Sequence, residues 1–248
     1  CYLKASYENN KYYFSLSGLT LGYLILTKVI FFYVVIPLSL LAVLGYFFSN
    51  QRYKVNYLVF VMAGIIITPY LLYTYSLTSK FPYLSSHAGE NIYWMSNPNE
   101  YEFGDANDFS FRINCGNVRS PCNSHLFELN HGEFFKSFSQ LDSISIDDEL
   151  RKKAFSNIVS YPTKYIRNYI QNISRLLFNS PNSYFYQQET TFYRIVPNAI
   201  VLTLFIFVLG LIFFKHQVFD RNIRDVFCFV FMYLAVSGLV SVDNRQFY

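Results

Sequence analysis

PYLLYTYSLTSKFPYLSSHAGENIYWMSNP, residues 69–98, decides how the chain is organised. This segment begins in apolar and aromatic residues and ends in Ser, Asn and Pro. The sequence before it consists mainly of long uncharged stretches, whereas polar residues dominate after it until residue 194. We therefore expect a membrane-embedded chain to leave the bilayer here and to continue as a water-facing domain.

The overall composition also indicates a membrane protein. Of 248 residues, 52% are hydrophobic and 21% are aromatic, whereas only 15% are charged. This is too apolar for an ordinary soluble fold. The net charge of +4 is small and no long Lys/Arg block occurs, so nucleic-acid binding is not expected. The chain starts at Cys1 without the pattern of a cleaved signal, and we expect it to be a segment of a longer protein.

The apolar stretches predict membrane helices, and the charges between them predict the topology. The stretches are 14–27, which is short, 29–48, 57–75, 195–214 and 226–242. The short links 50–56 and 215–225 are both basic, and basic short loops face the cytoplasm. The sequence thus predicts an all-α polytopic membrane protein, in which residues 1–75 and 195–248 form membrane helices. The inserted domain, 76–194, is expected to be mostly helical and extracytoplasmic.

Two helices are predicted near the end of the inserted domain. Ser145, followed by acidic residues, has the pattern of an N-cap, and the next turns carry an apolar face at Leu150, Ala154 and Ile158. Pro162 suits the first turn of a second helix. One side of that helix is apolar, formed by Tyr165, Ile166, Tyr169, Ile170, Ile173 and Leu177. Such a helix can lie on the outer membrane surface or pack into the domain core, and the sequence leaves both open.

The cysteines and histidines of the inserted domain allow two interpretations. Cys115 and Cys122 bracket a short turn, and outside the cytoplasm such a pair is expected to form a disulfide. His125 and His131 follow closely, so a Cys/Cys/His/His zinc site is the alternative, although the spacing matches no common finger pattern. We expect no resident metal or cofactor, since a divalent ion is conceivable but not indicated. Nucleotide-binding glycine loops and a Ser/His/Asp arrangement are not recognised in the sequence.

Three short elements resemble parts of membrane glycosyltransferases of the GT-C class. Gly18 to Gly22, followed by Leu26-Thr27-Lys28, is similar to that class's Gly-Leu-x-x-Gly-x-x-x-Leu-Thr-Lys element. The 69–98 segment looks like the family's exit segment, but Tyr73 and Thr74 stand where many relatives have Arg-Asn. Residues 243–248 look like the acidic-x-Arg-aromatic element that begins the next helix. The chain thus resembles dolichyl-phosphate-mannose protein mannosyltransferases and aminoarabinose transferases.

The resemblance implies where a substrate binds. In relatives the basic residue at the position of Lys28 lies near the carrier-lipid phosphate, and the predicted topology puts Lys28 and Arg245 at the same outer face. The alternative for Lys28 is an interface anchor whose ammonium group only reaches water. His87 is a second candidate contact to a substrate phosphate, with a structural hydrogen bond as its alternative. Acids after the Asn-Pro turn are ordinarily solvated loop charges, and Asp105 is taken as a candidate substrate contact among Glu100, Glu102, Asp105 and Asp108.

The expected function is transfer of a sugar from a polyprenyl-phosphate donor to an unidentified acceptor at the outer face of a bacterial inner membrane. In relatives the activating acid lies on an N-terminal exterior loop outside this chain, so no catalytic base is assigned. The alternatives are a transporter or flippase for a lipid-linked saccharide and a non-catalytic membrane scaffold. Charges lie at the ends of the apolar stretches rather than in their middle, which favours the enzyme over a transporter.

Overall fold

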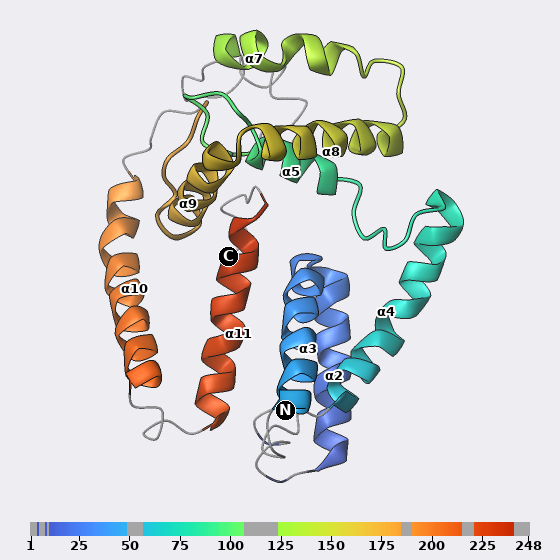
Figure 1. Cartoon of the computed structure of the whole chain (residues 1–248), viewed down its shortest axis with the longest axis vertical. Coiled ribbons are helices and arrows are strands. Elements are labelled where there is room, and N and C mark those ends of the chain that lie inside the picture. The colour runs from blue at the N-terminus through green and yellow to red at the C-terminus, as the bar shows by residue number, and fades with distance from the viewer. Residues whose placement is uncertain are drawn as a thin grey trace. The chain divides into compact units, whose positions relative to one another are not determined.

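The computed structural model describes residues 4, 8, 10–48, 57–106, 124–184, 190–214 and 221–240. Within these ranges the regular secondary structure is α-helical, and no strand occurs (Figure 1). The chain divides into two compact units. The first comprises residues 1–85 and 209–236, and the second comprises 86–208 and 237–248. The all-α class predicted from the sequence is confirmed for the described residues.

The first unit is built on close packing between two apolar helices. Helix α2, Lys11–Thr27, lies against α4, Tyr57–Thr78 (Figure 1). A Cβ atom added at Gly18 would lie 2.5 Å from the carbonyl oxygen of Val59, and one at Gly22 would lie 2.7 Å from Cβ of Ile66. The Gly-x-x-x-Gly pair therefore serves contact between helices of the same chain, because only the missing side chains let the backbones approach.

Aromatic stacking joins two further helices of this unit. Helix α3, Ile30–Phe48, contains Pro37, and α11 covers Arg221–Gly238, of which the last two residues belong to the second unit. The Phe31 ring stacks on Tyr233 with the ring centroids 5.2 Å apart. Helix α11 begins earlier than expected, so Arg221 and Arg224 belong to a helix and not to the predicted link.

Two of the described helices are long and apolar enough to cross a membrane, judged by length and composition. They are Leu58–Thr78 of α4 and Thr191–Leu211 of α10, which as a whole covers Thr190–Phe214. The described apolar parts of α3 and α11, Ile30–Leu40 and Val226–Gly238, are shorter. These two helices, α4 and α10, support membrane association. The full set of membrane spans and the extracytoplasmic placement of residues 76–194 stay predictions.

The second unit contains an aromatic core. Helices α5, Ala88–Met95, α7, Ser124–Lys136, and α8, Ser143–Ser160, contribute most of it. Its buried members are Tyr93, Trp94, Phe127, Phe135, Phe138, Leu150, Ala154 and Tyr184. Their rings meet edge to face or offset, as aromatic quadrupoles favour. Helix α5 reaches α8 so closely at Gly89 that the Gly89 N–H donates to the Asp147 carboxylate at 2.6 Å.

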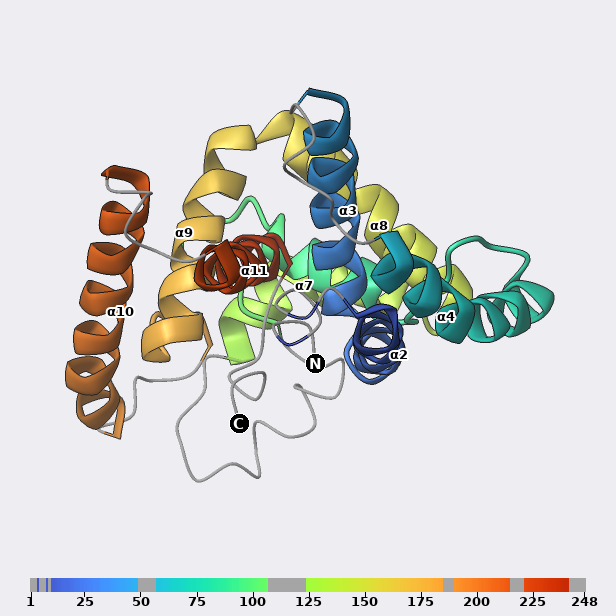
Figure 2. The same ribbon diagram turned by 90° about the horizontal axis from the view of Figure 1, so that it is seen from below.

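The two predicted helices of this unit form, with one changed boundary. Helix α8 starts at Ser143 because Asp142, and not Ser145, is the N-cap, accepting a hydrogen bond from the Ile144 N–H. Leu150 and Ala154 are buried as expected. Helix α9, Pro162–Phe178, begins at its proline, as predicted, and follows α8 after a sharp turn (Figure 2). It ends at Asn179, whose left-handed backbone conformation closes the last turn.

Candidate functional site

Lys28 lies between two apolar helices of the first unit. It forms the C-cap of α2, and its backbone N–H donates to the Leu24 carbonyl at 2.9 Å. Its own carbonyl accepts from the Phe31 N–H at 3.0 Å, so α3 starts almost at once. The Lys28 side chain is exposed. The close contacts of Gly18 and Gly22 with α4 hold α2 in place, and therefore also the backbone at Lys28, from which the side chain extends.

The structure describes only some of the other residues that the sequence singled out. Arg245, Cys115 and Cys122 lie outside the described residues, so the second cation and the disulfide stay predictions. His87 is the N-cap of α5, its side chain is 74% exposed, and its Nδ1 lies 3.0 Å from a Glu90 carboxylate oxygen. His87 thus has the structural contact that its alternative foresaw, and it is also open to solvent. Convergence of these residues on one phosphate remains a prediction.

Asp105 is buried, which differs from the solvated loop expected for its cluster. Only 7% of its surface is exposed, and its carboxylate accepts hydrogen bonds from both the backbone N–H and the hydroxyl of Ser183. The Arg175 guanidinium lies 3.7 Å away. Asp105 therefore ties the segment after Pro181 to the segment after Asn97, and a contact with substrate would have to displace these partners.

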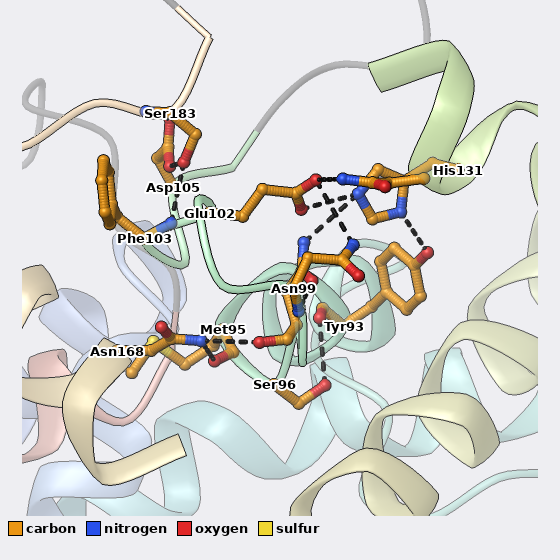
Figure 3. A network of polar contacts seen from close by, with 12 residues as sticks. Tyr93, Met95, Ser96, Asn99, Glu102, Phe103, Asp105, His131, Asn168 and Ser183 are labelled. Carbon is orange, nitrogen blue, oxygen red and sulfur yellow. Dashed lines mark hydrogen bonds and ion pairs between the residues drawn. The ribbon is translucent and has the colours of Figure 1, made fainter. Parts of the chain in front are cut away.

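Glu102 and His131 form the centre of a buried polar network (Figure 3). Glu102 is 1% exposed and His131 is 3% exposed. The Nε2 atom of His131 lies 2.8 Å from a Glu102 carboxylate oxygen, and Nδ1 lies 2.6 Å from the Tyr93 hydroxyl. With Nε2–H donating to the carboxylate, Nδ1 accepts the Tyr93 proton. Solvation of Glu102, expected from the sequence, is therefore wrong.

Two amides complete the shell around the Glu102 carboxylate. Asn130 and Asn99 both donate to its Oε1 atom, Asn99 at 3.3 Å. A buried carboxylate is costly unless hydrogen bonds replace its water, and here three side chains do so. Because both ring nitrogens of His131 face protein groups, this histidine lacks the open lone pair that the zinc alternative requires.

Helix α9 supplies the other half of the network. The Asn168 side chain is fully buried and donates to the carbonyls of Met95 and Asn97, each at 3.0 Å (Figure 3). Lys164 donates to the Glu102 carbonyl and to the Asn168 amide oxygen. These bonds hold the turn that follows α5 against α9. The close approach also suits Gly104, whose positive φ of 79° favours glycine.

Arg175 continues this polar side of α9 two turns beyond Asn168. It is 2% exposed, and its guanidinium donates to the carbonyls of Phe103 and Pro181 and to the Asn172 amide oxygen. Burial lowers the pKa of Arg175, and the neighbouring Asp105 carboxylate acts in the opposite direction. The charge is held by carbonyl dipoles as well as by one carboxylate, which is how buried cations are normally stabilised.

Burial also governs the other titrating groups of the network. It raises the pKa of Tyr93, and the nearby Glu102 carboxylate adds to the effect. Burial lowers the pKa of Lys164, as does the cation of Arg167, while Glu102 works against them. Lys164 lies at the edge of the network, lining a shallow depression with Tyr161 and Arg167. The centre of the network is closed, so its groups position the backbone of residues 95–105.

The sequence could not reveal this network because its partners are distant along the chain. Glu102 and His131 are separated by 29 residues, and Asn168 lies 71 residues from Asn97. The available signal was the periodicity of polar residues in α9, where Lys164, Asn168, Asn172 and Arg175 recur at intervals of three or four residues. That pattern marks a polar helix face but not its partner.

Comparison of the chain with protein-family models, with curated proteins and with solved structures gives no match.

Proposed function

We propose that the protein is a membrane glycosyltransferase that takes a sugar from a polyprenyl-phosphate donor. The observation that carries the proposal is the position of Lys28, an exposed cation at the junction of two apolar helices. The proposal is supported by the resemblance of residues 18–28 to the element that lies near the carrier phosphate in GT-C enzymes. Arg245 is proposed as the second cation, and His87 and Asp105 as further substrate contacts. The acceptor is not assigned.

Lys28 is suited to a lipid phosphate for electrostatic reasons. It is the only Lys or Arg between residues 12 and 51 of the sequence. A carrier lipid has its phosphate at the membrane interface and its prenyl chain in the hydrocarbon, so an apolar helix ending in a cation matches both parts. A charge-assisted hydrogen bond contributes about 1.5 to 3 kcal/mol. The basic link 50–56, together with the basic residues Lys215, Arg221 and Arg224 before and in the first turn of α11, supports an outer location for this site, and for residues 76–194, in a bacterial inner membrane.

The proposal is tested by donor binding to the full-length protein in lipid vesicles. Lys28→Ala should weaken binding of radiolabelled polyprenyl phosphate about 10- to 150-fold, and Lys28→Arg should retain part of it because the charge is kept. Lys11→Ala is the matched control, since Lys11 is the exposed cation at the other end of α2. It should bind as the parent does.

Unchanged donor binding by Lys28→Ala would contradict the phosphate site and leave Lys28 as an interface anchor. A cysteine-labelling reagent that cannot cross membranes checks the orientation. In intact cells it should modify a cysteine introduced at Ser79 and not one at Gln217, and the reverse result would place Lys28 at the cytoplasmic face.

A further inference from the structure

Helix α9 is amphipathic in an unusual sense, because its polar face is the buried one. Asn168 and Asn172 are fully buried, whereas Ile166 and Ile170 are 59% and 62% exposed. At 100° per residue these two pairs lie on opposite sides of the helix. Of the two placements that the sequence left open, packing into the domain core does not hold for Ile166 and Ile170. Ile166 and Ile170 point away from the unit that the amides hold.

Hydrogen bonds fix this orientation at several points along the helix. Asn168 holds the carbonyls of Met95 and Asn97, as described above. One turn further, the Asn172 amide donates to the carbonyls of Gly238 and Val240, at the end of α11. A rotation that buried the isoleucines would leave these carbonyls without the amides and would place the amides in solvent. The exposed apolar face is thus imposed by the buried polar one.

The same helix is attached to the ends of two apolar helices. The Tyr165 hydroxyl donates to the Leu239 carbonyl at 2.8 Å, just after α11 ends. A Cβ at Gly238 would lie 2.6 Å from side-chain atoms of Ile173 and Tyr169, so this end of α11 is packed tightly on α9. At its other end, the Leu177 carbonyl accepts from Asn198, in the second turn of the membrane-length stretch of α10.

The composition around the exposed isoleucines matches a lipid interface. Tyr165 and Tyr169 border the apolar face on the side of α11, and the exposed Arg167 borders it on the other side. Tyrosines at the level of the headgroups and a cation facing anionic lipid are features of helices that lie in a membrane surface. Apolar side chains are exposed on α10 as well, where Val201 and Leu204 are 65% and 57% exposed.

We infer that α9 lies in the membrane surface, with Ile166 and Ile170 inserted among the acyl chains of the leaflet where α10 begins and α11 ends. The occupant of this face is the lipid bilayer. Through Asn168 and Asn172, an embedded α9 connects that surface to residues 95–105 and to the end of α11. The inference rests on the membrane placement within the proposed function and does not depend on sugar transfer.

Photo-crosslinking in the full-length protein tests this inference directly. Benzoylphenylalanine is introduced at Ile166 or Ile170, and the protein is reconstituted in vesicles of phosphatidylethanolamine and phosphatidylglycerol, irradiated and analysed by mass spectrometry. Position Leu204 of α10 is the control for lipid contact, and Lys136 of α7, whose side chain is 60% exposed, is the control for water. Phospholipid adducts at Ile166 and Ile170 should match those at Leu204 and exceed those at Lys136 about tenfold.

Each other outcome overturns the inference. Dimers crosslinked through Ile166 or Ile170 would identify a second copy of the chain as the occupant, and an intramolecular crosslink would identify another segment of the protein. Adduct yields as low as those at Lys136 would mean an aqueous surface. If Leu204 also lacked lipid adducts, the membrane placement itself would fail, whereas lipid adducts at Leu204 alone would refute only the role of α9. Neither result depends on donor binding at Lys28.

Discussion

Replacing Asn168 by leucine removes the amide that holds residues 95–105 while nearly preserving side-chain volume. Asn168 is fully buried, and its amide donates to the Met95 and Asn97 carbonyls at 3.0 Å. After the substitution both carbonyls face a methyl group. A buried acceptor left without its donor costs about 1 to 3 kcal/mol, so the pair is expected to cost about 2 to 6 kcal/mol. Lys164 also loses one of its acceptors.

Amide hydrogen exchange of the full-length protein, followed by mass spectrometry, measures this loss where it should occur. Peptides from residues 95–105 should exchange at least about thirty-fold faster, which corresponds to the lower end of the predicted cost. Peptides from α2 and α4, in the other compact unit, should be unaffected. Thr163→Leu is the matched control, because it places the same side chain at an exposed position of the same helix.

A change smaller than about fivefold in the 95–105 peptides, equal to about 1 kcal/mol, would refute the reasoning. It would mean that the two carbonyls find other donors at little cost, and that α9 does not hold this segment. Equal acceleration in Asn168→Leu and Thr163→Leu would refute it as well, because the effect would then come from the leucine and not from the lost amide.

Two further predictions concern the helix contacts and the cap of α8. Gly18→Ala should lower stability by about 1 to 3 kcal/mol, because its Cβ would meet Val59 and Met62, whereas Gly64→Ala, with nothing within 4 Å, should be neutral or slightly stabilising. Thermal unfolding in detergent compares them, and equal stability would contradict the tight α2–α4 contact. The Ser145 hydroxyl, with the backbone N–H groups, holds the pKa of Asp142 below its ordinary value of 3.8. The stabilisation of α8 by the Asp142 carboxylate is therefore present above pH 3.8 and is lost as the pH falls through the pKa of the folded state. Hydrogen exchange of residues 143–147, corrected for the pH dependence of the intrinsic exchange rate, should accelerate on acidification. Asp142→Asn should remove this pH dependence, and persistence of the dependence in that variant would assign it to another group.

The helices were predictable where the sequence carries its own signal. The uncharged stretches and Pro162 located α3, α4, α9 and α10 because length, apolarity and a proline at the first turn act locally. The start of α8 was displaced because Asp142 and Ser145 are both good caps, and the structure uses the first and bonds the second to it.

The candidate site was less predictable, because its environment depends on distant residues. Glu102 resembles any loop acid until Asn130 and His131 of α7 close over it. The amphipathic pattern of α9 predicted a polar and an apolar face, but periodicity alone does not say which of the two packs against the rest of the protein. The prediction for Lys28 depended on its neighbours in sequence, and the structure places it between the two helices expected there.

The aromatic core of the second unit provides a spectroscopic signal of its own. Trp94 is the only tryptophan in the sequence, it is 1% exposed, and its ring lies 4.8 Å from the His131 ring. Its fluorescence emission therefore comes from the interior of this unit, while the apolar helices α2, α3, α4, α10 and α11 contain no such fluorophore. The emission wavelength of Trp94 changes when water enters the core, and the emission intensity depends on the neighbouring His131 ring. Folding of this unit can thus be observed optically in intact vesicles without any attached label.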